Sequence, residues 1–188
     1  MAKIGLNNFR YGILTEGQDG TPSYGGALTP GKAISCSVDI TNNEATLYAD
    51  DALAESDTSF SGGNVTIGID DDDIETMATL LGHKVDGGTG VMTRNTGDIA
   101  PYVGFGRVIT KQVSNSIKYK VEFLYKVKFS EPSQEDNTKG ESVEFATPEI
   151  EGIVSALANG KWSETGTFDT KQEAISFLEG LLAATPSV

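Results

Sequence analysis

The clearest pattern in the chain is a period of two between Ile117 and Phe129. Every odd position in this stretch is apolar or aromatic, and every even position except Leu124 is charged. Successive side chains of a β-strand point to opposite faces, so this period predicts one strand with an apolar face and a charged face. Typical strands run to about 5–6 residues. The length of this one predicts an extended sheet.

Other segments also have strand patterns, at residues 4–14, 32–40, 63–69, 102–112 and 161–168. In the second of these segments, one face carries Ile34, Cys36, Val38 and Ile40. Residues 141–154 change phase around Pro148, which predicts a bulge or a break in that strand. Together the segments predict a single, mainly β domain over residues 1–188, built as a sandwich or barrel of two packed antiparallel sheets.

Two segments switch to helical spacing. Ile74, Met77 and the pair Leu80–Leu81 follow the aspartate run 70–73, and Gly82 is a typical helix stop. A second helix is predicted at about residues 169–184, capped by Asp169 or Thr170. Its apolar face carries Ala174, Phe177, Leu178, Leu181 and Leu182. The expected fold is therefore mainly β with one flanking helix and a C-terminal helix, with α+β as the neighbouring class.

Residues 41–60 are acidic and rich in turn-forming residues, interrupted by Leu47 and Tyr48. The pattern predicts a long loop at about these positions. A loop of this length is too long for a hairpin turn, and long loops in compact domains usually serve a function or are ordered by a partner.

Charge limits the classes of partner. The net charge is −13, with eleven acidic and no basic residues from Asp39 to Glu75. Half of the 14 Lys and Arg residues lie between Arg107 and Lys139. Tight binding to nucleic acid or to an anionic membrane draws on clustered Lys and Arg, so this balance argues against both. No apolar run approaches the ~18 residues of a membrane span, and no secretory signal is visible at the start of the chain.

Candidate chemistry is sparse. A calcium loop starting at Asp70 requires glycine and a carboxylate where Glu75 and Leu81 stand, so the aspartate run predicts a helix cap. His83 is the single histidine, and its place at a helix end predicts a bond to the last carbonyls. The glycines at 87–90 and 104–106 lack the strand–turn–helix context of a phosphate loop. Cys36 is predicted to be a small packing residue within a strand. We expect no enzyme, no cofactor and no metal site.

Four sequence motifs in order resemble the major tail tube proteins of long, non-contractile bacteriophage tails. The first two are Leu47-Tyr48-Ala49-Asp50-Asp51 and Leu80-Leu81-Gly82-His83-Lys84. The third runs from Lys126 through Pro148, and the fourth from Gly160 to Thr170. They cover nearly the whole chain. The long C-terminal helix with its Ala-Ala-Thr-Pro tail departs from the family pattern.

The resemblance implies two packed sheets with a flanking helix, in a virion structural protein that assembles itself into stacked hexameric rings. The rings form a negatively charged tube for DNA ejection, so genomic DNA is a partner only in transit. Other partners are the tape measure, tail terminator and distal tail proteins, and no membrane is involved. The protein would be made in the host cytoplasm and reside in the tail of the virion.

The resemblance also implies that the 41–60 segment bridges subunits, through Leu47, Tyr48, Ala49, Asp50 and Asp51. Separately, the charged face of 117–129 is either a solvated surface or an inter-subunit contact formed by Lys118, Lys120, Lys126 and Lys128. An alternative function is a secreted or surface β-sandwich that binds carbohydrate or adhesive partners. In that case Trp162 and the aromatics at Tyr102 and Phe105 would form a sugar platform.

Overall fold

The structure is a computed structural model that describes residues 2–49, 52–114, 116–133 and 147–183, with the backbone alone for 45–49 and 52–57. The main strands are β1 (Ala2–Glu16), β2 (Pro22–Tyr24), β3 (Ala33–Ala49), β4 (Ala52–Ile69), β7 (Val103–Val113), β8 (Ser116–Phe129), β9 (Glu149–Ser155) and β10 (Ser163–Phe168). The helices are α1 (Ile74–Leu81) and α2 (Lys171–Leu182), and β5 (Lys84–Val85) pairs with β6 (Met92–Thr93). The predicted mainly β fold with two helices is confirmed.

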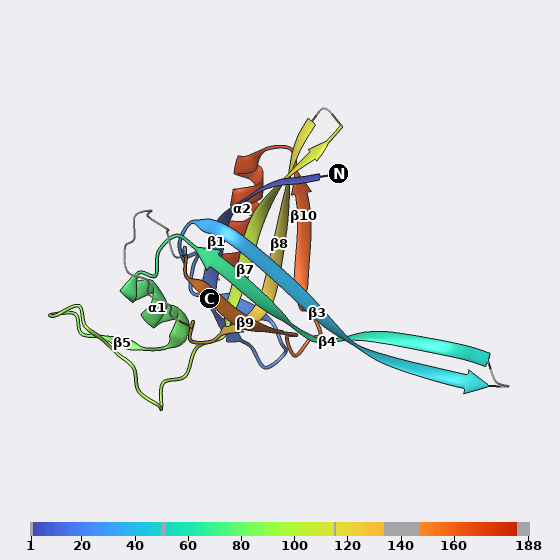
Figure 1. Ribbon diagram of the computed structural model, residues 1–188, viewed down its shortest axis with the longest axis horizontal. Helices are drawn as coiled ribbons and strands as arrows, with labels where there is room; N and C mark the ends of the chain where they lie inside the picture. Colours follow the sequence, from blue (N-terminus) through green and yellow to red (C-terminus); the bar gives the residue numbers. More distant parts are fainter. Residues whose placement is uncertain (1, 50–51, 115, 134–146, 184–188) are drawn as a thin grey trace, which may run out of the picture.

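The main strands form one antiparallel sheet in the order β2-β1-β7-β8-β9-β4-β3, and β10 joins it at β8 (Figure 1). β8 is the centre of this sheet because two strands share one of its edges. Residues 119–124 of β8 pair with β10, and residues 126–129 pair with β9. The sheet curls over itself, so that β4 and β9 contribute to the same core as β1, β7 and β8.

This first core lies inside the curled sheet. Its buried residues are Phe9, Tyr11, Val65, Ile67, Ile69, Met77, Leu80, Leu81, Val103, Phe105, Leu124, Val127, Phe129, Ile150 and Val154. Helix α1 supplies Met77, Leu80 and Leu81 to it. The Asp73 side chain accepts a hydrogen bond from the backbone amide of Thr76 at the start of α1, and Gly82 ends the helix in the left-handed conformation. The aspartate run therefore caps a helix, as its sequence predicts.

A second core lies between the outer face of β1, β7 and β8 and helix α2. Ala174, Leu178 and Leu182 of α2 are each 0% exposed. Thr170 caps the helix in a capping box with Glu173. A side chain at Gly106 of β7 would lie 2.2 Å from Leu178, so this glycine lets the helix approach the strand closely. The salt bridge from Arg10 to Glu179 (3.2 Å) joins β1 to the same helix.

A β-bulge in β8 corrects the prediction that all odd positions of 117–129 share one face. Phe105 pairs with Leu124 and Val103 with Val127, so β8 has one residue more than β7 between these pairs. Before the bulge, Val121 and Phe123 face α2. After it, Val127 and Phe129 lie in the first core together with Leu124. The extra residue falls where β8 changes neighbour from β10 to β9, and an inserted residue reverses the alternation of faces.

The other strand predictions are confirmed in position and corrected in detail. Bulges also interrupt β1, where Asn8 has φ 53°, and β3, where the register shifts between Ala33 and Ser35. The bulge in β3 leaves Ile34 48% exposed, so Ile34 does not lie on the inner face with Cys36. β9 begins at Glu149, directly after Pro148, and the predicted strand at 141–146 lies outside the described residues.

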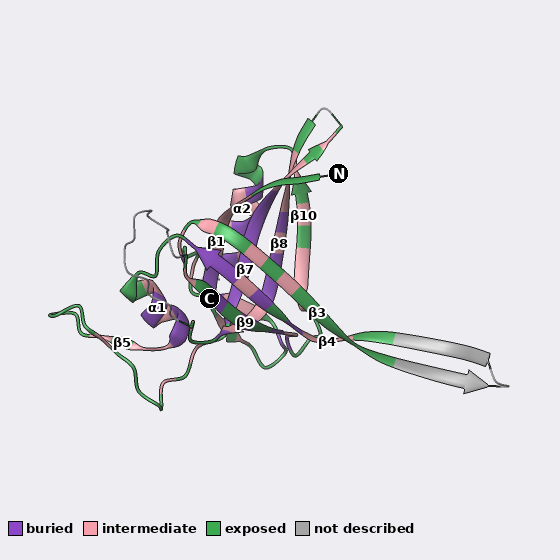
Figure 2. Ribbon diagram, viewed as in Figure 1, coloured by how far each residue is buried: buried purple, intermediate pink, exposed green. Residues whose placement is uncertain are grey.

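The prediction of a loop at 41–60 is wrong. β3 continues to Ala49 and β4 begins at Ala52, so this part of the chain is a long two-stranded hairpin. Its Asn, Asp and Glu residues are depleted in strands generally. They are compatible with a strand here because the hairpin extends beyond the rest of the sheet (Figure 1), and the described side chains of Asn42, Asn43 and Glu44 are exposed (Figure 2).

The second core gives the first stability prediction. Leu178→Ala should lower the free energy of unfolding by about 2–5 kcal/mol, because it leaves a cavity against Phe123 and Val108. Urea denaturation followed by circular dichroism measures this loss. Ser176→Ala on the exposed side of the same helix is the matched control and should change the stability by less than about 0.5 kcal/mol. Equal effects of the two variants would contradict the placement of α2.

Candidate functional site

The most distinctive feature of the molecule is the part of the β3–β4 hairpin formed by residues 41–60, which we call the arm. Its strands pair with each other from Thr41–Gly62 out to Ala49–Ala52. β4 pairs with β9 only through residues 63–68, so the arm continues beyond the sheet (Figure 1). Within the described parts of the chain, no other strand pairs with either edge of the arm.

The arm is strongly acidic. It contains five carboxylate side chains and no Lys, Arg or His: Glu44, Asp50, Asp51, Glu55 and Asp57. Of the residues predicted to bridge subunits, Leu47, Tyr48 and Ala49 lie near the far end of β3, opposite Glu55, Leu53 and Ala52. Asp50 and Asp51 lie outside the described residues. The sequence analysis therefore mistakes the secondary structure of this region, and the bridging role of these residues stays a prediction.

An aromatic pair fixes the root of the arm. The rings of Phe60 in β4 and Trp162, just before β10, are stacked with centroids 4.6 Å apart and an interplanar angle of 6°. Beside the stack is a pocket of about 280 Å³ between β3 and the β7–β8–β10 part of the sheet. Its lining includes Val38, Ile40 and Trp162. The arm therefore leaves the body of the protein beside a partly apolar hollow.

A buried ionic group lines the same pocket. Arg107 is 7% exposed and donates to Glu122 and to the thiol of Cys36, with Nη1 2.6 Å from Sγ. Lys120 also donates to Glu122. Burial by itself would raise the pKa of the Glu122 carboxyl, but the hydrogen bond from Lys120 and the nearby positive charges lower it below 4.5. Burial raises the pKa of Cys36 and outweighs the charge of Arg107. The thiol is thus a contact of Arg107 as well as a packing group.

The four lysines of the charged strand pattern divide into two pairs. Lys118 and Lys120 precede the bulge and form ion pairs with Asp169 and Glu122. Lys126 lies within the bulge and Lys128 after it, and both ammonium groups lie over the ring of Tyr102, at 4.8 and 5.3 Å from its centroid. Lys126 also reaches Glu16 at 2.6 Å. Within the chain these lysines already contact acidic or aromatic groups, and they do not form one continuous face.

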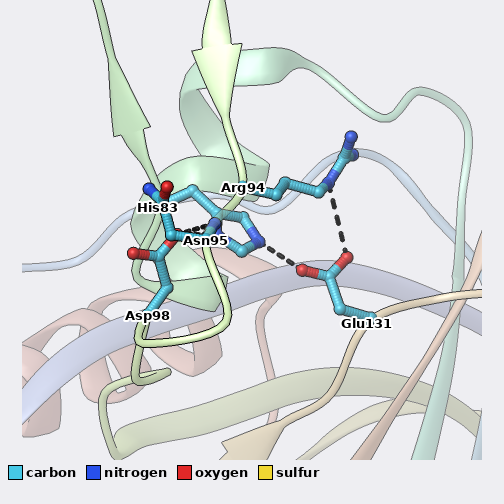
Figure 3. A network of polar contacts seen from close by, with 5 residues as sticks. All are labelled: His83, Arg94, Asn95, Asp98 and Glu131. Carbon is cyan, nitrogen blue, oxygen red and sulfur yellow. Dashed lines mark hydrogen bonds and ion pairs between the residues drawn. The ribbon is translucent and has the colours of Figure 1, made fainter.

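The single histidine takes part in a polar network. Its Nδ1 lies 2.8 Å from Oδ2 of Asp98, and its Nε2 contacts Glu131 (Figure 3). The backbone amide of His83 donates to Ala78 at the end of α1. The prediction that the imidazole bonds the helix carbonyls is therefore wrong, because two carboxylates compete for it more strongly than neutral carbonyls do. No spacing pattern along the chain indicates this network, since Glu131 is 48 positions from His83.

The described residues form neither a metal-binding cluster nor a sugar platform. Among them, no group of three or more His, Cys, Asp or Glu is arranged to hold a metal ion. Of the three aromatics of the alternative reading, Phe105 is 1% exposed, Trp162 stacks on Phe60 and Tyr102 lies beneath two lysines. They do not form one open aromatic surface. The glycines at 104 and 106 make room for Tyr24, Phe123 and Leu178, which is a packing role.

Comparison with known proteins adds no assignment. The chain matches no model of a protein family, and no curated protein matches its sequence. None of the helices in the described residues is long and apolar enough to cross a membrane.

The ionic group at the pocket gives the second prediction. Glu122→Gln should lower the free energy of unfolding at pH 7 by about 1–3 kcal/mol, because it leaves the buried Arg107 without its carboxylate. The pKa of Glu122 is lower in the folded state, so its contribution is present above pH 4.5 and is lost as the pH falls through the folded value. Denaturation of both proteins at pH 7 and below pH 4.5 measures the difference, which should shrink on acidification.

Lys118→Gln is the control for this variant. Its ion pair with Asp169 is much more exposed, so removing it should change the stability by less than about 1 kcal/mol. A Glu122→Gln protein as stable as wild type at pH 7 would contradict the role given to the buried pair.

Proposed function

We propose that this protein is a virion structural protein, the subunit of a phage tail tube built from stacked hexameric rings. The observation that carries the proposal is the arm. A two-stranded hairpin is marginally stable alone in water, and this one extends past the sheet with both edges open in the described structure. Such an arm gains neighbours when other copies of the chain surround it.

Open strand edges give the arm a physical means of binding. An unpaired edge presents a row of amide and carbonyl groups that another strand can pair with. The arm carries five carboxylates and no basic residue. Like charges oppose pairing of one arm with another, so its complement is a different surface of a neighbouring copy. This arrangement favours ordered head-to-tail contacts over random aggregation.

The body of the subunit has further edges suited to ring formation. In the described structure β10 pairs with β8 on one side, and β3 ends the main sheet on the other. A neighbour placed at these edges would extend the sheet from one subunit to the next. Six subunits would close the ring, in line with the resemblance of the sequence motifs to tail tube proteins.

The charge of the protein fits a conduit for DNA. Each copy carries a formal net charge of −13, and a ring of six carries six times as much. A negative wall repels the phosphate backbone and releases no counterions to it, so DNA slides through without adhering. Tape measure, tail terminator and distal tail proteins are the further partners of such a tube. The site of action is the virion tail, and the proposal assigns the protein no catalytic reaction.

Shortening the arm tests the proposal. Purified wild-type protein at high concentration should form rings or tubes in negative-stain electron micrographs. In the variant, an Asn-Gly turn replaces residues 44–58 and joins Asn43 to Ser59, which already pair across the hairpin. This protein should keep its circular dichroism spectrum and remain monomeric by size-exclusion chromatography. Tubes formed by the shortened protein would overturn the role of the arm.

Strictly monomeric wild-type particles under all conditions, including in the presence of tail-initiator proteins, would count against the whole proposal. The shortened protein is informative only if it folds. Its thermal unfolding should therefore stay cooperative, because the described residues of both cores lie outside the deleted segment.

Charge reversal tests the acidic tip separately. The double variant Asp50→Lys with Asp51→Lys should fold as a monomer and assemble poorly, since two carboxylates of the arm then carry the wrong charge for their partner surface. Asp71→Lys with Asp72→Lys makes the same change in net charge at exposed positions off the arm. This control should assemble like wild type. Equal assembly by the two double variants, measured by sedimentation, would speak against the arm as the contact.

A further inference from the structure

The segment between α1 and β7 leaves the body of the protein and returns to it. We call residues 84–98 of this segment the excursion (Figure 1). It contains the short β5–β6 hairpin, and most of its residues are exposed. Met92 packs against the first core, whereas Val91 is 57% exposed. Regions with few buried apolar contacts open at low free-energy cost. The excursion therefore depends on polar contacts to stay in place.

The principal polar contact is made by His83, where the excursion begins. Its imidazole lies between Asp98 at the far end of the excursion and Glu131 in the segment after β8 (Figure 3). The side chain of His83 is 6% exposed, which leaves little room for water to replace either carboxylate. Three segments that are distant in sequence thus meet at one ring.

The number of protons on the imidazole decides whether both of its contacts with carboxylates are hydrogen bonds. A neutral imidazole has one N–H donor, and its other nitrogen is an acceptor, as an ionised carboxylate is. The imidazolium form has two N–H donors and satisfies both carboxylates at once. Loss of the proton turns one of the two contacts into a repulsion between lone pairs. The geometry is complete only when His83 is charged.

The surrounding charges favour the same state. Arg94 of the excursion lies 3.6 Å from Glu131, and the backbone amide of Asn95 donates to Asp98 at 2.9 Å. Lys84, next to His83 in the chain, is exposed. With His83 protonated, the two carboxylates face two cations, His83 and Arg94. Without that proton, a partly buried carboxylate loses its counter-charge.

We propose that His83 is a proton-dependent clasp that holds the excursion to the segment following β8 and releases it when the proton is lost. The clasp is a conformational device of the subunit and does not rest on the function proposed above. It places a pH-dependent opening beside α1, at a site distinct from the arm.

The direction of the pH dependence follows from the contacts. The hydrogen bond to Asp98, and then that to Glu131, raise the pKa of His83 above 6.5, although burial opposes them. A group whose pKa is raised by folding contributes stability below its unfolded pKa and loses it as the pH rises through the folded value. The excursion is therefore closed at pH 6 and opens on the alkaline side of the folded pKa.

Nuclear magnetic resonance gives a direct test, because His83 is the sole histidine and its ring protons are unambiguous. The wild-type ring should titrate above pH 6.5. Asp98→Asn and Glu131→Gln should each shift the midpoint down towards 6.5, because each removes a carboxylate from the ring. A wild-type midpoint at or below 6.5 would overturn the proposal.

Amide hydrogen exchange, corrected for the intrinsic rate at each pH, tests the opening itself. Protection of residues 84–98 should fall as the pH rises through the midpoint of His83, while β7 and β8 stay protected. In His83→Gln, protection of the excursion should be low and independent of pH. Lys84→Gln is the matched control, since it removes one positive charge from the exposed next residue in the chain and should behave like wild type.

Two outcomes would refute the clasp. The first is an excursion in His83→Gln that is as protected as in wild type. The second is a fall in protection that is equally steep in β7 and β8, which would indicate global unfolding. If His83→Gln does not fold, Asp98→Asn gives the same comparison, because it keeps the imidazole and removes one of its two carboxylates.

Discussion

One edge of β8 serves two neighbours, and the shape of the molecule depends on how the strand accommodates them. β10 occupies the first part of that edge and β9 the second. β10 stays with the layer that α2 covers, whereas β9 leads into β4 and the curled side of the sheet. The bulge between Leu124 and Val127 makes this division possible, because it turns the apolar side chains from one core to the other. A strand with strict alternation would direct its apolar side chains to one core and supply none to the other.

The arm stands outside this arrangement. Of the arm residues whose side chains the structure describes, Phe60 packs against the first core, and its stack on Trp162 anchors the root of the arm. The same chain thus combines a body stabilised by burial with an arm whose strands, in the described structure, pair only with each other. That division suits the proposed assembly, in which contacts with neighbouring copies form without disturbing the fold. The pocket at the root of the arm contains the ion pair of Arg107 and Glu122. Burying the charge of Arg107 there without Glu122 would lower the stability of the fold.

Much of the fold follows from sequence patterns, and the exceptions have physical reasons. Periodicity located the strands, and the capping residues located both helices, because these signals act over a few neighbouring residues. Leu124 is the single apolar residue at an even position of this strand. The pattern alone does not identify a bulge there, which becomes evident from the pairing of β8 with β7. The arm was mistaken for a loop because acidic and Asn residues are weak strand formers. The His83 network was out of reach, since Asp98 and Glu131 come together through tertiary structure.

The salt bridge between Arg10 and Glu179 bears on when the protein can fold. Residues of β1 and α2 lie close together although 169 positions separate these two side chains in the chain. Contacts of this sequence separation form late and slow the search for the native state. On a ribosome, β1 is made early and has to wait for α2 before the second core can close. The protein therefore acquires its final surface only after α2 has been synthesised, and a chain that still lacks α2 has an open second core.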